Sequence, residues 1–276
     1  MESCPPNIYT LGLLFGKDTG PSITEPERFG AIVDILKSIP LPDNISLRCR
    51  GYIAIARDKN VAPRKARPSP VVLNSWATAL SKGRFVDFEL FDSERSYHID
   101  PRFYAKLHKY YNWEPSGYIE QTAWGAENNV TLAMDTSAIE FDIVDYENHL
   151  LRLADLTRAF CGSVQLDMPW AVPTSPGSGL QRAMIDCKDT DVGLRPYGLN
   201  GRRLMNDMLP FLSQGILFRP SHLLQEIEAI PQEYIARRED RSDGTTYLRF
   251  VVAPESDLQL EAILRSVFRL LPDYKP

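Results

Sequence analysis

The feature that most constrains the fold is a short run, residues 84–91, in which apolar and charged side chains alternate ("RFVDFELF"). Successive side chains of an extended chain point to opposite faces. One face of such a strand carries Val86, Phe88 and Leu90, and the other carries Phe85, Asp87, Glu89 and Phe91. This pattern predicts a half-buried antiparallel strand, with helices on the apolar face and carboxylates displayed on the other.

Other segments show either strand or helix periodicity. Strands are expected at residues 7–16, 45–56 and from Ser163, and residues 130–144 read as a strand pair or one bent strand. Residues 233–252 read as a hairpin that turns at Asp243-Gly244. Apolar residues at helical spacing predict helices at residues 24–40, 70–83, 145–162 and 255–272, whereas residues 100–129 read as irregular. This order predicts an α+β fold with a mixed or antiparallel sheet packed by amphipathic helices, and it allows two loosely similar halves.

Local signals mark the expected helix ends. Thr24 and Ser256 are each followed three residues later by Glu or Gln, which is the spacing of a capping box. Pro40 is expected to close the first helix. Gly162 is expected to terminate the helix that begins near Asp145.

A loop rich in Pro, Ser and Gly at residues 173–179 is the best place for a domain boundary. It would separate an N-terminal α+β lobe, residues 1–172, from a C-terminal α+β lobe, residues 180–276. One continuous domain is the alternative, since 276 residues fit either organisation.

The charge is unevenly distributed along the chain. The net charge of −5 argues against a dedicated nucleic-acid-binding protein. Residues 43–84 hold nine Lys/Arg against two Asp/Glu, whereas residues 85–167 hold six against fifteen. A basic block followed by an acidic block indicates a polarised surface.

No segment indicates export, a membrane span or a cofactor. The N-terminus lacks a positive start, and no apolar run reaches the ~20 residues of a membrane helix. The four cysteines are far apart, which is typical of free thiols in a reducing compartment. We therefore expect a cytoplasmic protein that needs no cofactor and no metal.

The residues typical of catalysis are present without the spacing that chemistry requires. The four histidines form neither H-E-x-x-H nor H-x-H, and the stretch "PGSGL" differs from the G-x-S-x-G nucleophile motif. Asp87 and Glu89 would lie ~7 Å apart on one strand face, within the range of glycoside hydrolases. Alternating acids also occur on solvated or partner-binding faces, and charge blocks unwanted strand pairing. We therefore expect a protein that is not an enzyme.

Aromatic and acidic residues are instead concentrated as they are in protein interfaces. Packing of these rings over the sheet is the alternative explanation. If they form a docking surface, the expected apolar anchors are Trp113, Tyr118 and Trp124, and the expected acidic contacts are Asp87, Glu89, Asp92, Glu94, Asp142, Asp145 and Glu147.

Three segments resemble the immunity protein 52 family of bacterial polymorphic-toxin immunity proteins. They are the first strand "NIYTLGLLFG", the strand "VDFELFD", and "CGSVQLDMPWAVPTSP" after a leucine-rich helix. The resemblance covers about the first two thirds of the chain, and "LLFG" stands where the family has a tryptophan.

The resemblance implies a cytoplasmic inhibitor of a cognate toxin, a basic nuclease of the restriction-endonuclease class delivered by type VI secretion. It implies no catalytic residues and no direct contact with nucleic acid or membrane. It leaves the oligomeric state open. The alternatives are a hydrolase that works through Asp/Glu residues and a non-enzymatic adaptor.

Overall fold

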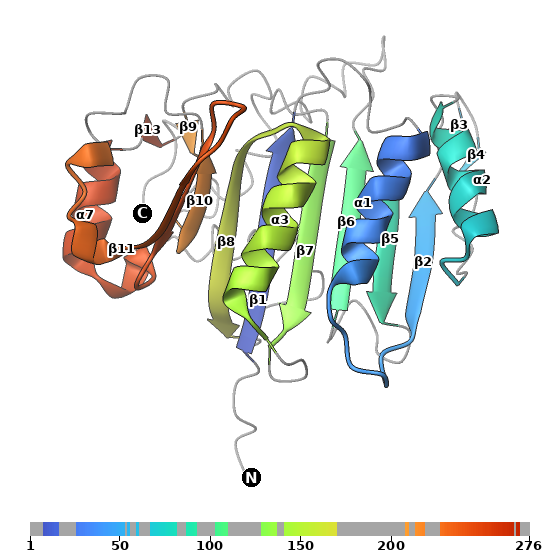
Figure 1. Ribbon diagram of the computed structural model, residues 1–276, viewed down its shortest axis with the longest axis horizontal. Helices are drawn as coiled ribbons and strands as arrows, with labels where there is room; N and C mark the ends of the chain where they lie inside the picture. Colours follow the sequence, from blue (N-terminus) through green and yellow to red (C-terminus); the bar gives the residue numbers. More distant parts are fainter. Residues whose placement is uncertain are drawn as a thin grey trace.

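A computed structural model gives the fold (Figure 1). It describes residues 8–16, 26–52, 54–55, 59–60, 67–81, 87–92, 103–109, 128–136, 141–169, 208–209, 213–218, 227–267 and 269–270.

The centre of the fold is a nine-stranded sheet in which every pair of neighbours is antiparallel. From one edge to the other its strands are β11 (Ile235–Asp240), β12 (Thr246–Phe250), β10 (Gly215–Phe218), β8 (Ala159–Pro169), β1 (Ile8–Gly16), β7 (Asn128–Asp135), β6 (Phe103–Lys109), β5 (Asp87–Asp92) and β2 (Leu47–Tyr52). The predicted α+β class with an antiparallel sheet is confirmed. Strands from both of the lobes expected from the sequence lie in this one sheet.

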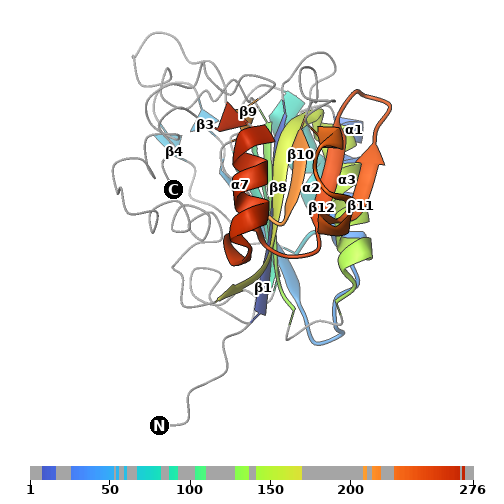
Figure 2. The same ribbon diagram turned by 90° about the vertical axis from the view of Figure 1, so that its left-hand side faces the viewer.

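Helices cover both faces of the sheet. On one face lie α1 (Pro26–Ser38), α2 (Pro70–Ser81) and α3 (Ile143–Thr157), and on the other lies α7 (Leu258–Val267) (Figures 1 and 2). Two short pairs of strands stand apart: β3 (Ala54–Ile55) with β4 (Lys59–Asn60), and β9 (Met208–Leu209) with β13 (Arg269–Leu270). Single 3-10 turns occur at Gln232–Tyr234 and Pro254–Ser256.

The core on the three-helix side forms as the periodicity predicts. The α1 residues Phe29, Ile32, Val33 and Leu36 are all buried, as is Ile39 just after the end of the helix. The Phe29 ring packs edge-on against the Phe88 ring of β5, with 5.1 Å between the ring centres. The Trp76 ring of α2 also packs edge-on against Phe88, with 6.1 Å between the ring centres. These contacts anchor α1 and α2 over β5.

A second apolar cluster lies between α7 and the strands β10 and β12. It contains Ile216, Leu248, Phe250, Leu260 and Leu264, all fully buried. The intervening β12 residue, Tyr247, belongs instead to the cluster under α3. Because alternate residues of β12 enter different clusters, this strand is buried on both faces.

The expectation that β5 is half-buried is wrong. Glu89 and Phe91, on the face opposite Phe88, are 4% and 2% exposed. On that face Arg50 of β2 and Tyr104 of β6, the strands on either side of β5, contact the Glu89 carboxylate and help to cover it. The strand β6 was also missed, since residues 103–109 belong to the segment that the sequence marked as irregular. Its Phe103, Ala105 and Leu107 alternate and are buried, as in any strand.

Three further expectations about the elements need correction. Residues 45–56 form β2 and the separate β3 rather than one strand. The strand at residues 130–144 ends at Asp135, and Ile143 and Val144 already belong to α3. The four-residue strand β10 was not expected at all.

The helix α3 ends at Thr157, five residues before the predicted stop at Gly162. Arg158 adopts the left-handed conformation (φ 51°), and its N–H bonds back to the carbonyls of Ala154 and Asp155. Gly162 lies inside β8 instead, opposite Leu14 and Leu217. The chain therefore passes directly from helix to strand.

At α7 the N-cap is Asp257, not Ser256. Its Oδ1 accepts from the backbone N–H groups of Gln259 (2.9 Å) and Leu260 (3.0 Å). The hairpin turn is confirmed, with Gly244 at φ +80°. Thr24 lies outside the described residues.

Two of the four cysteines, Cys49 and Cys161, are free and buried, as expected. Burial raises the pKa of the Cys49 thiol to about 11 and also raises the pKa of Cys161. Cys4 and Cys187 lie outside the described residues.

Candidate partner-binding groove

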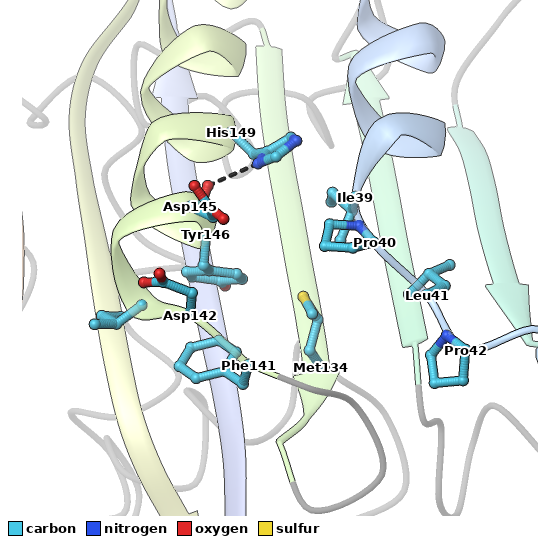
Figure 3. A pocket seen from close by; sticks show the side chains of 11 residues that line it. Ile39, Pro40, Leu41, Pro42, Met134, Phe141, Asp142, Asp145, Tyr146 and His149 are labelled. Atoms are coloured by element: carbon cyan, nitrogen blue, oxygen red, sulfur yellow. Dashed lines mark hydrogen bonds between the residues drawn. The ribbon is translucent and has the colours of Figure 1, made fainter.

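A groove with a cavity volume of about 820 Å³ opens between the end of α1 and the start of α3 (Figure 3). One wall is formed by residues 39–42 and the other by Phe141, Ile143 and Tyr146, with Met134 of β7 between them. The groove therefore has an apolar lining contributed by three separate parts of the chain.

Proline shapes the first wall. The helix α1 ends at Ser38, whose hydroxyl donates to the Ile35 carbonyl (2.8 Å). Pro40 lacks an N–H and cannot extend the helical hydrogen bonding. The Pro42 carbonyl then accepts from Ile45 N–H (2.9 Å), which turns the chain toward β2.

Tyr146 fixes the second wall. Its hydroxyl donates to the Leu132 carbonyl of β7 (3.0 Å), and its ring lies 5.7 Å from that of Phe141. The close approach of α3 to the sheet requires a glycine at position 12 of β1. The Cβ of any other residue there would lie only 2.8 Å from the Tyr146 hydroxyl oxygen and from Leu150 Cδ1. The wall is thus held by both hydrogen bonding and packing.

Two exposed carboxylates stand on the rim, Asp142 and Asp145. Asp142 is the N-cap of α3, and its Oδ1 accepts from Val144 N–H (2.8 Å). Asp145 lies in the first helical turn, and no described residue pairs with its carboxylate. The rim therefore displays two negative charges at the helix N-terminus.

His149 completes the polar part of the rim. Its Nδ1 lies 2.7 Å from the backbone carbonyl oxygen of Asp145 (Figure 3). A carbonyl oxygen only accepts, so Nδ1 carries the proton and donates. In the neutral ring, Nε2 is then left as a hydrogen-bond acceptor.

The predicted acidic contacts fall into different environments. Asp142 and Asp145 lie together on the groove. Glu147, two positions further along α3, is fully buried on another side of the helix. In β5, Asp92 is 1% exposed, and Asp87 takes part in strand pairing with Tyr52 and His108. Glu94, Trp113, Tyr118 and Trp124 lie outside the described residues.

Glu89 was expected to be displayed to solvent, and this exposure is not observed. Its carboxylate pairs with the Arg50 guanidinium and accepts from the Tyr104 hydroxyl (3.1 Å). The Arg50 guanidinium also stands 5.7 Å from the centre of the Phe91 ring. Glu89 thus neutralises a buried arginine within the sheet.

Glu147 is the centre of a second buried charge cluster, which joins α3 to the hairpin. Arg237 donates to its Oε2 (2.9 Å) and the Tyr247 hydroxyl donates to its Oε1 (2.7 Å). Arg249 Nε also lies 2.7 Å from Oε1, close enough for an ion pair but not aligned as a hydrogen bond. Burial and then the charge of Glu147 raise the pKa of Tyr247 well above 10, so the hydroxyl stays a donor.

The residues that the structure describes offer neither a metal site nor a membrane-spanning helix. They contain no group of three or more His, Cys, Asp or Glu side chains arranged to bind a metal ion. None of their helices combines the length and the hydrophobicity needed to cross a bilayer.

The sequence indicated the acidic rim but not the apolar lining. In the sequence, Pro40 indicates only the end of a helix, and His149 belongs to no metal-binding or catalytic motif. Leu41 between two prolines is a local signal for an apolar side chain held outside a helix. No sequence pattern links it to Phe141 or Tyr146, about 100 positions away.

Comparison with known proteins identifies the fold. No protein-family model and no curated protein matches the chain, so the likeness to the immunity protein 52 family stays a prediction. A solved structure described as a Pseudomonas aeruginosa T6SS protein, PA0821, has a similar fold. The TM-score is 0.63 over 97% of this chain and 76% of the other, with 13% sequence identity.

Proposed function

We propose that this chain is an immunity protein associated with a type VI secretion system, and that it binds and neutralises a cognate antibacterial toxin. The observation that carries the proposal is the similarity of its fold to that of a Pseudomonas aeruginosa T6SS protein. The resemblance of three sequence segments to immunity proteins supports the same conclusion.

The groove supports binding as the mode of action. Protein interfaces combine an apolar, desolvated centre with a polar rim. The groove has the same arrangement, with Met134, Phe141 and Tyr146 in its lining and Asp142 and Asp145 on its rim. Opposite charges across an interface mainly raise the association rate and the specificity.

A basic nuclease suits such a surface. An enzyme that cleaves nucleic acid presents positive charge to the phosphate backbone. Carboxylates of an inhibitor can occupy the same positions and block the active site or the DNA-binding groove. A stable interface buries about 800 Å² on each partner, so the toxin must also contact surfaces beside the groove.

The first test is to inspect the adjacent upstream gene, where we expect a toxin-like open reading frame, and to purify its product as the candidate toxin. Purified toxin is titrated with this chain, DNA cleavage is measured, and complex formation is followed by size-exclusion chromatography. We expect a stable complex and complete inhibition at a fixed stoichiometric ratio. Co-expression should also restore the growth of cells that produce the toxin.

Three results would contradict the proposal, and each points elsewhere. Inhibition by catalytic amounts of the chain would indicate the alternative hydrolase. A stable complex with full nuclease activity would indicate an adaptor. Absence of both a complex and growth rescue would remove the toxin as the partner.

A further inference from the structure

We propose that the groove between α1 and α3 holds an arginine side chain from an extended basic segment of the partner. This inference rests on the proposed function, because it specifies what the toxin would place there. It is argued from the shape, the charge and the hydrogen-bonding groups of the groove.

The apolar lining suits the long carbon chain of arginine. Protein pockets that bind ligands measure about 300–1,000 Å³, and a volume of about 820 Å³ accommodates one large side chain together with its neighbours. Met134 and Phe141 offer apolar surface to the methylene groups. The face of an aromatic ring also attracts a guanidinium, and the half-buried Phe141 ring is available for such a contact.

The balance of charge favours a cation over an anion. Among the described residues that line the groove there is no lysine or arginine, whereas Asp142 and Asp145 contribute two negative charges. The N-terminus of α3 offsets only about half an elementary charge. The rim therefore remains negative, and an anionic group such as a phosphate is disfavoured.

The rim offers several hydrogen-bond acceptors, which suit a group with many N–H donors such as a guanidinium. Asp142 caps α3 with Oδ1, so its Oδ2 can accept hydrogen bonds from a ligand. Asp145 has no side-chain partner among the described residues, and the neutral ring of His149 leaves Nε2 as an acceptor. A guanidinium has five N–H donors in a planar fork, whereas a lysine ammonium has only three and is more strongly hydrated. Arginine is therefore the better occupant.

The first experiment measures toxin affinity with two rim variants. Asn is as good an N-cap as Asp, so Asp142→Asn removes the charge without removing the cap. The double variant Asp142→Asn/Asp145→Asn should weaken binding by about 10- to 100-fold, as for lost hydrogen bonds to charged groups. The control Asp34→Asn/Glu228→Gln removes two other exposed charges and should change the affinity by less than about threefold.

The second experiment does not depend on the toxin. Two acetylated tripeptide amides, Leu-Arg-Leu and Leu-citrulline-Leu, are titrated while the ring resonances of His149 are followed by NMR. Citrulline has nearly the shape of arginine but no charge. We expect saturable shifts with the arginine peptide, weaker shifts with the citrulline peptide, and none with the double rim variant.

The two experiments separate this inference from the proposed function. Inhibition of the toxin with unchanged affinity of the double rim variant would overturn the arginine site and leave the immunity function standing. Absence of any complex with the toxin would contradict the immunity function. The peptide titrations would then still show whether the groove binds arginine. Equal shifts with both peptides, or no shift with either, would also overturn the arginine site.

Discussion

Asp145 and Glu147 stand two positions apart on α3 but have opposite environments. Residues two apart in a helix are separated by roughly 200° around its axis, whereas residues three or four apart share a side. Asp142, Asp145 and His149 therefore lie along one side, at the groove. Glu147 points toward the hairpin and is fully buried beside Arg237 and Tyr247. A count of acidic residues along the sequence does not distinguish these two roles.

Glu147 is expected to act on stability rather than on partner binding. Removal of one member of a buried ion pair leaves the other charge uncompensated, which typically costs about 3–5 kcal/mol. We predict that Glu147→Gln lowers the free energy of unfolding by about 3 kcal/mol, measured by urea denaturation. Glu228→Gln, at an exposed position, should change it by less than about 0.5 kcal/mol. Equal effects of the two changes would contradict the structural role of Glu147.

At the scale of elements, periodicity predicts where the helices lie but not how they begin and end. The buried side of α1 and the buried strand residues Phe88 and Leu90 follow their expected spacing. The helix ends differ because several nearby residues have suitable side chains. Ser256 and Asp257 can both cap a helix, and only the path of the backbone places Asp257 within reach of two free N–H groups.

The cap of α7 can be tested by a pair of neighbouring substitutions. Loss of an N-cap side chain typically costs about 1 kcal/mol. We predict that Asp257→Ala lowers the free energy of unfolding by about this amount, because two backbone N–H groups lose their partner. Ser256→Ala, at an exposed position, should have an effect of less than about 0.5 kcal/mol. Urea denaturation measures both, and a larger effect at Ser256 would reject the assignment.

The sheet also shows which features a single sequence cannot predict. Alternation identifies β5 as a strand, but not that side chains of its neighbours β2 and β6 cover its second face. The groove depends on strand order in the same way. Residues 39–42 and Phe141 become neighbours only because the sheet brings α1 and α3 side by side. Long-range pairing of this kind leaves no periodic signal in the local sequence.

For the molecule as a whole, the sheet connects residues from both sides of the predicted boundary. β8 pairs with β1 on one side and with β10 on the other. Leu217 and Tyr247 join the same apolar cluster as Leu14 and Leu150. Glu147 adds an ion pair between α3 and Arg237 of β11.

These links predict cooperative unfolding. In urea, we expect the fluorescence of Trp76, which packs on Phe88, to change together with hydrogen exchange at the amides of β12, in a variant whose other three tryptophans are replaced by phenylalanine. Coincident transitions from different probes indicate a two-state process. Loss of protection in β12 at a lower urea concentration than the fluorescence change would show instead that the C-terminal strands unfold separately.

The position of β1 has a consequence for how the protein is made. This strand leaves the ribosome before the other strands of the sheet, yet it lies between β7 and β8, which begin only at Asn128 and Ala159 (Figure 1). At about 5–20 residues per second, translation of the intervening chain takes roughly 5 to 30 seconds. During that time both hydrogen-bonding edges of an apolar segment are unpaired in the nascent chain, where a chaperone is best placed to shield them.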